Sequence, residues 1–306
     1  MLKINKKKLI VIIGPTASGK TKLGIKIASE FNSDIIYADS RQFYKELKIG
    51  TAKPSKSELS TVNHYFINNL SINEEYSVGK YKEDVELFLK EYFKLKDTAV
   101  IVGGSGLFID VIIKGIDNMP NVPKEFREKL NISYKTKGLI SLIEKLKDVD
   151  IESYKKIDLK NPQRVIRALE VSLYSKKPYS SFHKGIKKMR DDIDIYFVGY
   201  NLSKEILYER INNRVDQMIE DGLVNEVRSL RKYKNLNALN TVGYKEIFDF
   251  LDTKINLDEA IEQIKINTKK YSKRQMTWFK KYKNVIWIDE NYKDDQVINK
   301  LKKSII

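Results

Sequence analysis

The chain has 306 residues, which is enough for one large domain or two ordinary ones. Its 42% hydrophobic content, 14 glycines and 6 prolines exclude a disordered or collagen-like chain, and the absence of cysteine excludes disulfides, thiolate metal sites and cysteine nucleophiles. Lys and Arg number 57 against 41 Asp and Glu, so the net charge is +16, which either lysine-rich codon usage or a polyanionic partner explains.

Short apolar runs alternate with amphipathic stretches along the chain, which is typical of an α/β protein. The apolar runs predict strands at residues 9–13, 35–38, 99–102, 195–199 and 285–288, with a weaker strand at 64–67. Strands that are separated by helices form a mainly parallel sheet with helices on both faces. No run approaches the roughly 18 apolar residues of a membrane span, so we expect a soluble, cytoplasmic protein with no membrane association.

The long gap between the third and fourth of these strands carries helical patterns. They lie at 124–135, 138–147 and 162–175, with Asn161 as the cap of the last. The segment GIDNMPNVP at the start of the gap has the prolines and glycine of a linker. We therefore predict a helical insertion domain at 115–192 and an α/β core made of 1–114 and 193–306. Further helices of the core are expected at 204–220, 223–233, 244–252 and 258–282.

A glycine loop follows the first predicted strand. Residues 14–21, GPTASGKT, match the pattern G-x-x-x-x-G-K-[ST], with a strand before them and an amphipathic helix after them. The backbone amides of such a loop and the N-terminus of its helix bind a di- or triphosphate, as in ATP-binding and other nucleotide-binding proteins. Lys20 is expected to neutralise phosphate oxygens, and the Thr21 hydroxyl suits Mg²⁺. The candidate phosphate-binding residues are Gly14, Pro15, Thr16, Ala17, Ser18, Gly19, Lys20 and Thr21.

Polar side chains follow the second and third predicted strands. Asp39 stands at the carboxyl end of the second strand, at the edge of the sheet that carries the glycine loop. Its carboxylate is a candidate Mg²⁺-linked ligand, a candidate general base, or simply the cap of its loop. Ser40, Arg41 and Gln42 follow it and can bond to a base, and Ser105 offers a hydroxyl after the third strand.

Basic residues are concentrated in two stretches without any acid, residues 176–190 and 264–283. Such stretches serve either as solvated helix faces or as rails for a nucleic-acid backbone. An apolar stripe in the second stretch, which includes Tyr271, is expected to face the core. Arg210 and Arg214 form an i,i+4 pair after the fourth strand, where a P-loop enzyme can bring an arginine to the phosphates.

Several strings between residues 14 and 279 occur together, in the order that one family shows. They are GPTASGKT, DSRQFY, GTAKP, VGGSGLFID, NPQRVIRALEV, RINNRVDQM, GLVNEV, NTVGYKE and KRQMTWF. On these strings the sequence resembles the tRNA dimethylallyltransferases, also called tRNA isopentenyltransferases, of bacterial type. The resemblance implies transfer of a dimethylallyl group from dimethylallyl diphosphate to the exocyclic amine (N6) of the adenosine 3′ to the anticodon, in tRNAs that read codons starting with U. It also implies a P-loop NTPase-like α/β fold, Mg²⁺ as cofactor and the tRNA anticodon stem-loop as partner, and we expect a monomer.

The matching positions imply roles for individual residues. Asp39 resembles the base that takes the amine proton, Arg214 resembles an arginine that handles the diphosphate, and Ser105 resembles a further catalytic position. Residues 14–21 are expected to hold the diphosphate, with Thr21 on the Mg²⁺. The positions expected to contact tRNA are Asp39, Ser40, Arg41, Gln42, Ser105, Arg127, Gln163, Arg164, Val165, Ile166 and Arg167.

The sequence departs from the family pattern in three respects. Ser105 stands where threonine is commoner, but the hydroxyl is kept. His64-Tyr65-Phe66 replaces a common His-His pair, so no catalytic role is assigned to a histidine there. The lack of cysteine predicts that the zinc finger of eukaryotic relatives is missing, in keeping with the bacterial type.

Three rival interpretations come from other functional classes. A P-loop nucleotide kinase needs an arginine-rich lid, which the sequence does not show convincingly. An isopentenyltransferase that acts on free AMP does not need a basic insertion or a long basic helix. A non-catalytic RNA-binding protein does not need the intact loop at 14–21 together with Asp39.

Overall fold

The computed structural model describes residues 6–183, 185 and 189–305. The chain divides into two compact units, which we call the core unit (Met1–Ile113 and Arg190–Ile306) and the insertion unit (Lys114–Met189). Among the described residues, no helix combines the length and the apolar character that a membrane span requires.

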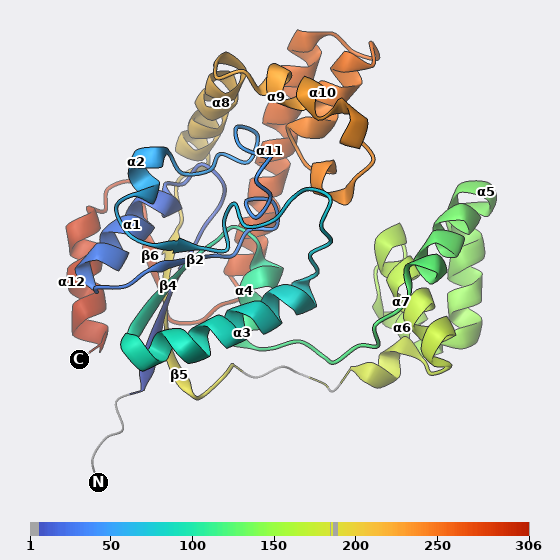
Figure 1. Cartoon of the computed structure of the whole chain (residues 1–306), viewed down its shortest axis with the longest axis horizontal. Coiled ribbons are helices and arrows are strands. Elements are labelled where there is room, and N and C mark those ends of the chain that lie inside the picture. The colour runs from blue at the N-terminus through green and yellow to red at the C-terminus, as the bar shows by residue number, and fades with distance from the viewer. Residues whose placement is uncertain (1–5, 184, 186–188, 306) are drawn as a thin grey trace. The chain divides into compact units, whose positions relative to one another are not determined.

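A six-stranded sheet forms the centre of the core unit (Figure 1). In spatial order the strands are β3 (His64–Tyr65), β2 (Ile35–Tyr37), β4 (Thr98–Val102), β1 (Lys7–Ile13), β5 (Ile193–Tyr200) and β6 (Val285–Ile288). Every neighbouring pair is parallel. The prediction of a parallel α/β sheet is therefore confirmed, and each predicted strand exists with ends that differ by at most two residues.

Helices cover both faces of this sheet because its central strands are apolar on both sides. Leu9 and Val11 of β1 pack into one apolar cluster, whereas Ile10 and Ile12 pack into the cluster on the opposite face. The helices on the first face are α3 (Val78–Leu95) and α4 (Gly106–Ile113), and those on the second face are α1 (Lys20–Glu30) and α12 (Asp294–Ile305).

A third apolar cluster joins the loop after β2 to four helices in the C-terminal half of the core unit. These are α8 (Lys204–Glu220), α9 (Leu223–Ser229), α10 (Tyr244–Leu251) and α11 (Leu257–Phe279). The predicted helix at 223–233 is too long, because α9 ends at Ser229 and a 3₁₀ turn, Arg231–Tyr233, follows it. The cluster fixes α8 and α11, which both contribute side chains to the site described below.

The insertion unit is helical and has an apolar cluster of its own. Its helices are α5 (Lys124–Val149), α6 (Ile151–Lys156) and α7 (Pro162–Ser175). Gly138 interrupts α5 with φ 77° and ψ 176°, where the sequence predicted the boundary between two helices. The predicted cap of α7 is confirmed, because the Asn161 side chain accepts hydrogen bonds from the backbone amides of Gln163 and Arg164.

Candidate functional site

The glycine loop at residues 14–21 connects β1 to α1. Gly14 and Gly19 have positive φ angles of 148° and 99°, a region that glycine enters without a steric cost. A β-carbon at Gly14 would lie 3.1 Å from both Ser18 Oγ and Tyr200 Cβ, so the turn is closely packed as well. The amides that follow stand at the N-terminus of α1, where the helix dipole favours an anion.

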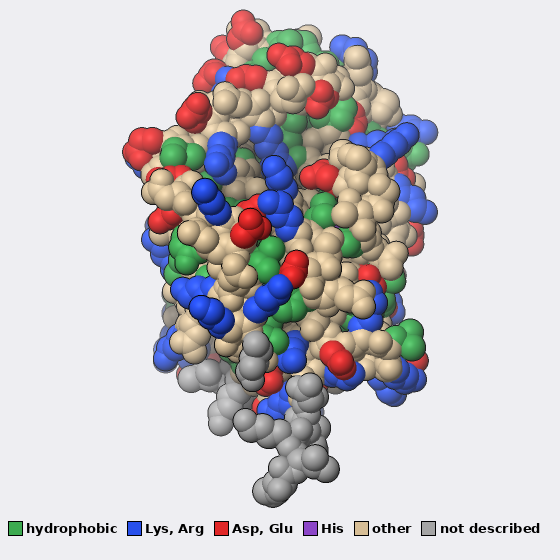
Figure 2. Space-filling view, turned by 90° about the vertical axis from the view of Figure 1, so that its left-hand side faces the viewer, with side chains coloured by type: hydrophobic (Ala, Val, Ile, Leu, Met, Phe, Trp, Pro, Cys, Tyr) green, Lys and Arg blue, Asp and Glu red, His purple; other side chains and the backbone are tan. Residues whose placement is uncertain are grey.

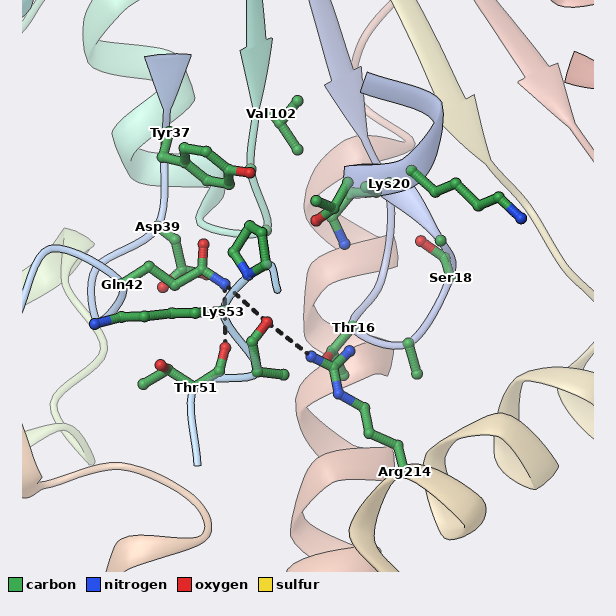
Figure 3. A pocket seen from close by; sticks show the side chains of 18 of the residues that line it. Thr16, Ser18, Lys20, Tyr37, Asp39, Gln42, Thr51, Lys53, Val102 and Arg214 are labelled. Carbon is green, nitrogen blue, oxygen red and sulfur yellow. Dashed lines mark hydrogen bonds between the residues drawn. The ribbon is translucent and has the colours of Figure 1, made fainter. Parts of the chain in front are cut away.

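A cavity of about 280 Å³ opens at this loop, and the loop, β2 and α8 all contribute to its wall (Figure 3). Its lining includes Thr16, Ala17, Ser18, Gly19, Lys20, Thr21, Tyr37, Asp39, Gln42, Thr51, Lys53, Arg214, Tyr271 and Gln275. The structure thus brings together the glycine loop, Asp39, Gln42 and Arg214, which come from widely separated strings of the sequence. We call this the phosphate cavity.

Lys20, Arg214 and Asp39 influence one another electrostatically in the phosphate cavity. Burial, and after it the neighbouring charge of Arg214, lower the pKa of Lys20 to about 7, while the charge of Asp39 opposes the shift. Burial also lowers the pKa of Arg214. The Lys20 ammonium group donates a hydrogen bond to the carbonyl of Pro15, 2.7 Å away. An anion that entered here would relieve the repulsion between the two cations.

Asp39 lies in the turn that follows β2. Its Oδ1 accepts a hydrogen bond from the backbone amide of Arg41 at 2.9 Å, which holds the carboxylate in the turn. The amide of Ser40 donates to Ser105 Oγ at 3.3 Å, so the predicted hydroxyl lies beside the same turn. Arg41 donates to the carbonyl of Asn240 at 3.3 Å. Three of the predicted tRNA contacts therefore surround Asp39.

The loop at residues 50–54 forms the opposite wall. Arg214 donates to the carbonyl of Ala52 at 3.4 Å, and Gln42 Nε2 donates to the carbonyl of Thr51 at 3.1 Å (dashed lines in Figure 3). Burial lowers the pKa of Lys53, whose side chain also lines the cavity, to about 8. This loop therefore fixes two predicted site residues through its backbone carbonyls.

A second cavity, of about 360 Å³, shares part of this wall. The side chains and backbone common to both cavities belong to Thr16, Asp39, Thr51, Ala52, Arg214 and Tyr271. The rest of its lining mixes polar residues such as Ser40, Arg41 and Lys245 with apolar ones such as Val215 and Met218. Asp39 and Arg214 can therefore reach groups bound in either space. We call it the acceptor cavity.

The sequence analysis missed two residues of α11 that belong to this site. Gln275 Oε1 accepts from the amide of Thr16 at 2.8 Å, and its Nε2 donates to the carbonyl of Gly104 at 2.9 Å. Tyr271, which was expected in the core, lines both cavities, and burial and the charge of Asp39 raise its pKa to about 12. Their i,i+4 spacing, which places both on one helix face, was the available signal.

The arginine pair on α8 reaches the glycine loop from two directions. Arg214 lines both cavities, whereas Arg210 donates to the carbonyl of Ser18 at 3.3 Å. The sequence predicted that one member of this pair reaches the phosphates, and the geometry favours Arg214.

The predicted tRNA contacts of the insertion unit divide into three kinds. Gln163 and Arg164 are exposed at the start of α7. Val165 and Ile166 have 0% and 1% exposure and pack in the apolar cluster of the unit, so their side chains are not available to RNA. The physical reason is the helical period, which turns these two apolar positions toward α5.

Arg127 and Arg167 both bind one buried carboxylate. Arg127 donates through Nε and an η nitrogen to the two oxygens of Glu170, at 2.7 and 2.6 Å, and Arg167 donates to Glu170 at 2.6 Å. Glu170 is 1% exposed. Arg127 of α5 therefore braces that helix against α7, whereas Arg167 holds the same carboxylate from within α7.

The two basic stretches are only partly free of acidic partners. Lys265 forms an ion pair with Asp216 of α8 at 2.8 Å, and Lys269 lies 5.4 Å from the centre of the Tyr208 ring. Lys184, Lys187 and Lys188 of the other stretch lie outside the described residues. On the face shown in Figure 2, Lys and Arg side chains gather around the middle, while acidic side chains are most numerous toward the top.

Comparisons with known proteins agree with this geometry. The family model described as "IPP transferase" matches residues 42–282. A tRNA dimethylallyltransferase of Flavobacterium psychrophilum is 49% identical, and the alignment covers 94% of each chain. The crystal structure of a tRNA isopentenylpyrophosphate transferase from Bacillus halodurans matches with a TM-score of 0.71 and 32% identity, over 98% of this chain and 96% of that one. A eukaryotic dimethylallyltransferase described as acting on tRNA shares the fold, with a TM-score of 0.80 at 24% identity.

Proposed function

This chain belongs to the IPP transferase family, and from that premise we propose that it transfers a dimethylallyl group from dimethylallyl diphosphate to the exocyclic amine (N6) of the adenosine 3′ to the anticodon, in tRNAs that read codons starting with U. The observation that carries the proposal is the wall common to the two cavities, because it places Asp39 and Arg214 between an anion site and a second binding space.

The reaction forms a bond between the amine nitrogen and the first carbon of the allyl group and breaks the bond from that carbon to diphosphate. The phosphate cavity suits the leaving group, since Lys20 and Arg214 stabilise negative charge that grows as the bond breaks. The amine of adenine is a poor nucleophile, because its lone pair is delocalised into the ring. Asp39 is the proposed acceptor of the proton that the amine loses.

The acceptor cavity is the proposed position of the adenine. A base in a stacked anticodon loop has to turn out of the stack before it can reach a pocket. Asp39 and Tyr271 line the acceptor cavity as well as the phosphate cavity, which supports Asp39 as the proton acceptor. The hydroxyl of Ser105, which lies beside the Asp39 turn, is the proposed partner of the adenine base.

Mg²⁺ is the proposed cofactor. No group of three or more His, Cys, Asp and Glu that could hold a metal exists within residues 6–183, 185 and 189–305. Mg²⁺ keeps several waters and needs only one or two protein oxygens in addition to phosphate, so the hydroxyl of Thr21 and the carboxylate of Asp39 fit it. Ser18 Oγ is buried without a hydrogen-bond partner in the described structure, which leaves one more polar atom for the diphosphate. The ion, when bound, supplies charge that stabilises the leaving diphosphate.

The anticodon stem-loop is the proposed macromolecular partner. Exposed Gln163 and Arg164 at the start of α7 and the basic stretch of α11 support contacts to the RNA backbone. Arg167, which Glu170 holds in place on α7, is a further candidate contact.

The proposal is tested by mass spectrometry of nucleosides from tRNA that was incubated with the protein, dimethylallyl diphosphate and Mg²⁺. We expect N6-isopentenyladenosine to appear, and to be absent from the same tRNA with guanosine at the modified position. Two further assays test the rival functions. They measure transfer to free AMP and hydrolysis of ATP without tRNA. Product from AMP alone, or no modified nucleoside in any tRNA, would contradict the proposal.

A further inference from the structure

Three of the strings noted in the sequence meet at one side chain that lines neither cavity. Glu226 of α9 accepts hydrogen bonds from the backbone amides of Lys48, Ile49 and Gly50, at 3.2, 2.8 and 3.2 Å. It also accepts from the hydroxyl of Tyr244 at 2.6 Å. GTAKP, GLVNEV and NTVGYKE thus supply Gly50, Glu226 and Tyr244 to a single cluster, which we call the Glu226 clamp.

The clamp has the geometry of an anion-binding site, and the anion is the side chain of Glu226. Consecutive backbone amides that point to one side form a concave nest for negative charge, and here the carboxylate of Glu226 occupies it. Gly50 allows the close approach, because a β-carbon there would lie 2.4 Å from Cε2 of the Tyr244 ring. Tyr244 is fully buried, so the ring cannot move aside easily. Hydrogen bonds to a charged acceptor are about twice as strong as neutral ones.

The peptide that follows the clamp belongs to the active-site wall. Thr51 and Ala52 line both cavities, and Ala52 has a left-handed backbone with φ 46°. The carbonyl of Ala52 accepts from Arg214, and that of Thr51 accepts from Gln42. The position of these two carbonyls depends on the three amides immediately before them, which the carboxylate of Glu226 holds.

We propose that Glu226 is a positioning residue for Arg214, which it orients through the backbone of residues 48–52. This inference rests on the proposed function only where it concerns the role of Arg214 in dimethylallyl transfer. Diphosphate binding tests by itself whether Glu226 positions Arg214. Glu226 lies on α9 and lines neither cavity, so it does not contact a bound ligand there itself.

The test uses Glu226→Gln in the full-length protein, with inorganic diphosphate and Mg²⁺ titrated by calorimetry. A misplaced catalytic group typically costs up to about 100-fold, and we expect diphosphate affinity to fall roughly 10-fold and dimethylallyl transfer roughly 10- to 100-fold. The matched control is Glu259→Gln, which removes a carboxylate that accepts a backbone amide at the start of α11, from Asn256 at 2.9 Å. The control should lower the melting temperature and leave diphosphate affinity unchanged.

A double-variant cycle separates positioning from general loosening of the fold. If Glu226 acts through Arg214, Glu226→Gln should weaken diphosphate binding much less when Arg214→Gln is already present. Equal fold-changes in both backgrounds, or wild-type affinity in Glu226→Gln, would overturn the inference. If Glu226→Gln does not fold, Tyr244→Phe removes one of the four donors and should show a smaller loss with the same dependence on Arg214, and no loss would count against the clamp. A wild-type protein that binds diphosphate but modifies no tRNA would contradict the proposed function alone.

Discussion

Arginines in the two units meet different partners. In the core unit, Arg214 donates to the neutral carbonyl of Ala52 and lies close to another cation, Lys20. In the insertion unit, Arg127 and Arg167 share the buried carboxylate of Glu170. The first arrangement leaves positive charge uncompensated in a cavity, so it favours an incoming anion. The second holds two guanidinium groups against one buried carboxylate, so the same residue type there contributes first to structure.

Asp39→Asn should have the largest effect on activity, because it removes the carboxylate that faces both cavities. The asparagine oxygen can still accept from the amide of Arg41, so the turn should persist. Loss of a positioned base typically costs 10²- to 10⁴-fold, and we expect that fall in kcat with a similar KM for dimethylallyl diphosphate. Steady-state kinetics across a Mg²⁺ titration, with a parallel thermal melt, measures it.

Two other outcomes would reassign Asp39. Weaker diphosphate binding that excess Mg²⁺ rescues would identify the carboxylate mainly as a metal ligand. A loss of about 1 kcal/mol in stability with little change in rate would identify it as a loop cap.

Lys20→Ala should come next, because it halves the cationic pair of the phosphate cavity. Removal of one group that stabilises developing negative charge costs about 10²- to 10³-fold, and diphosphate binding should weaken as well. Lys26→Ala on the same helix is the matched control, since Lys26 forms an ion pair with Asp294 instead of lining the cavity. Single-turnover transfer and calorimetry with diphosphate provide the readouts. Near-normal transfer by Lys20→Ala would remove the phosphate role from the glycine loop.

Glu170→Gln tests the other side of the comparison. The change removes the negative charge that Arg127 and Arg167 share, and hydrogen bonds to charged groups are worth about 1.5–3 kcal/mol each. We expect faster hydrogen exchange in α5 and α7 and an unchanged affinity of the core unit for diphosphate. Unchanged exchange in both helices would show that the two arginines do not brace the insertion unit.

The parallel sheet could be predicted from the sequence, because strands such as β1 are buried on both faces. Each therefore forms a continuous apolar run that is visible without knowledge of its neighbouring strands. The sequence analysis did not predict α3 or α12, although the buried residues of α3, Tyr81, Val85, Leu89 and Tyr92, recur at helical spacing. At the site, the glycine loop and Asp39 follow strand ends, and the carboxyl ends of parallel strands meet at one edge. Local rules therefore predicted their proximity.

Other site residues depend on contacts between distant parts of the chain, which a local pattern does not specify. Gln275 binds the amide of Thr16, which is 259 positions away in the chain. Glu226 binds amides about 176 to 178 positions away. A match to a string treats the five residues from Gln163 to Arg167 alike, whereas the helix turns the side chains of Val165 and Ile166 into the core.

The smallest expected effect is a proton taken up when diphosphate binds, and it arises from the buried Lys20. In the free protein the pKa of this amine is lowered to about 7, from a usual value of 10.5. A bound diphosphate favours the charged ammonium form, so binding raises the pKa again. Between pH 7 and the raised value, the complex holds more protons than the free protein, and diphosphate affinity should therefore fall as pH rises through that window, by at most about one decade per pH unit. Calorimetry in buffers of different ionisation enthalpy measures the proton uptake, to which diphosphate itself also contributes.

Lys20→Arg separates the contribution of Lys20 from that of diphosphate, because a guanidinium stays charged throughout the window. We expect wild type to take up more protons than Lys20→Arg near pH 8, and equal uptake would mean that Lys20 is already fully charged in the free protein.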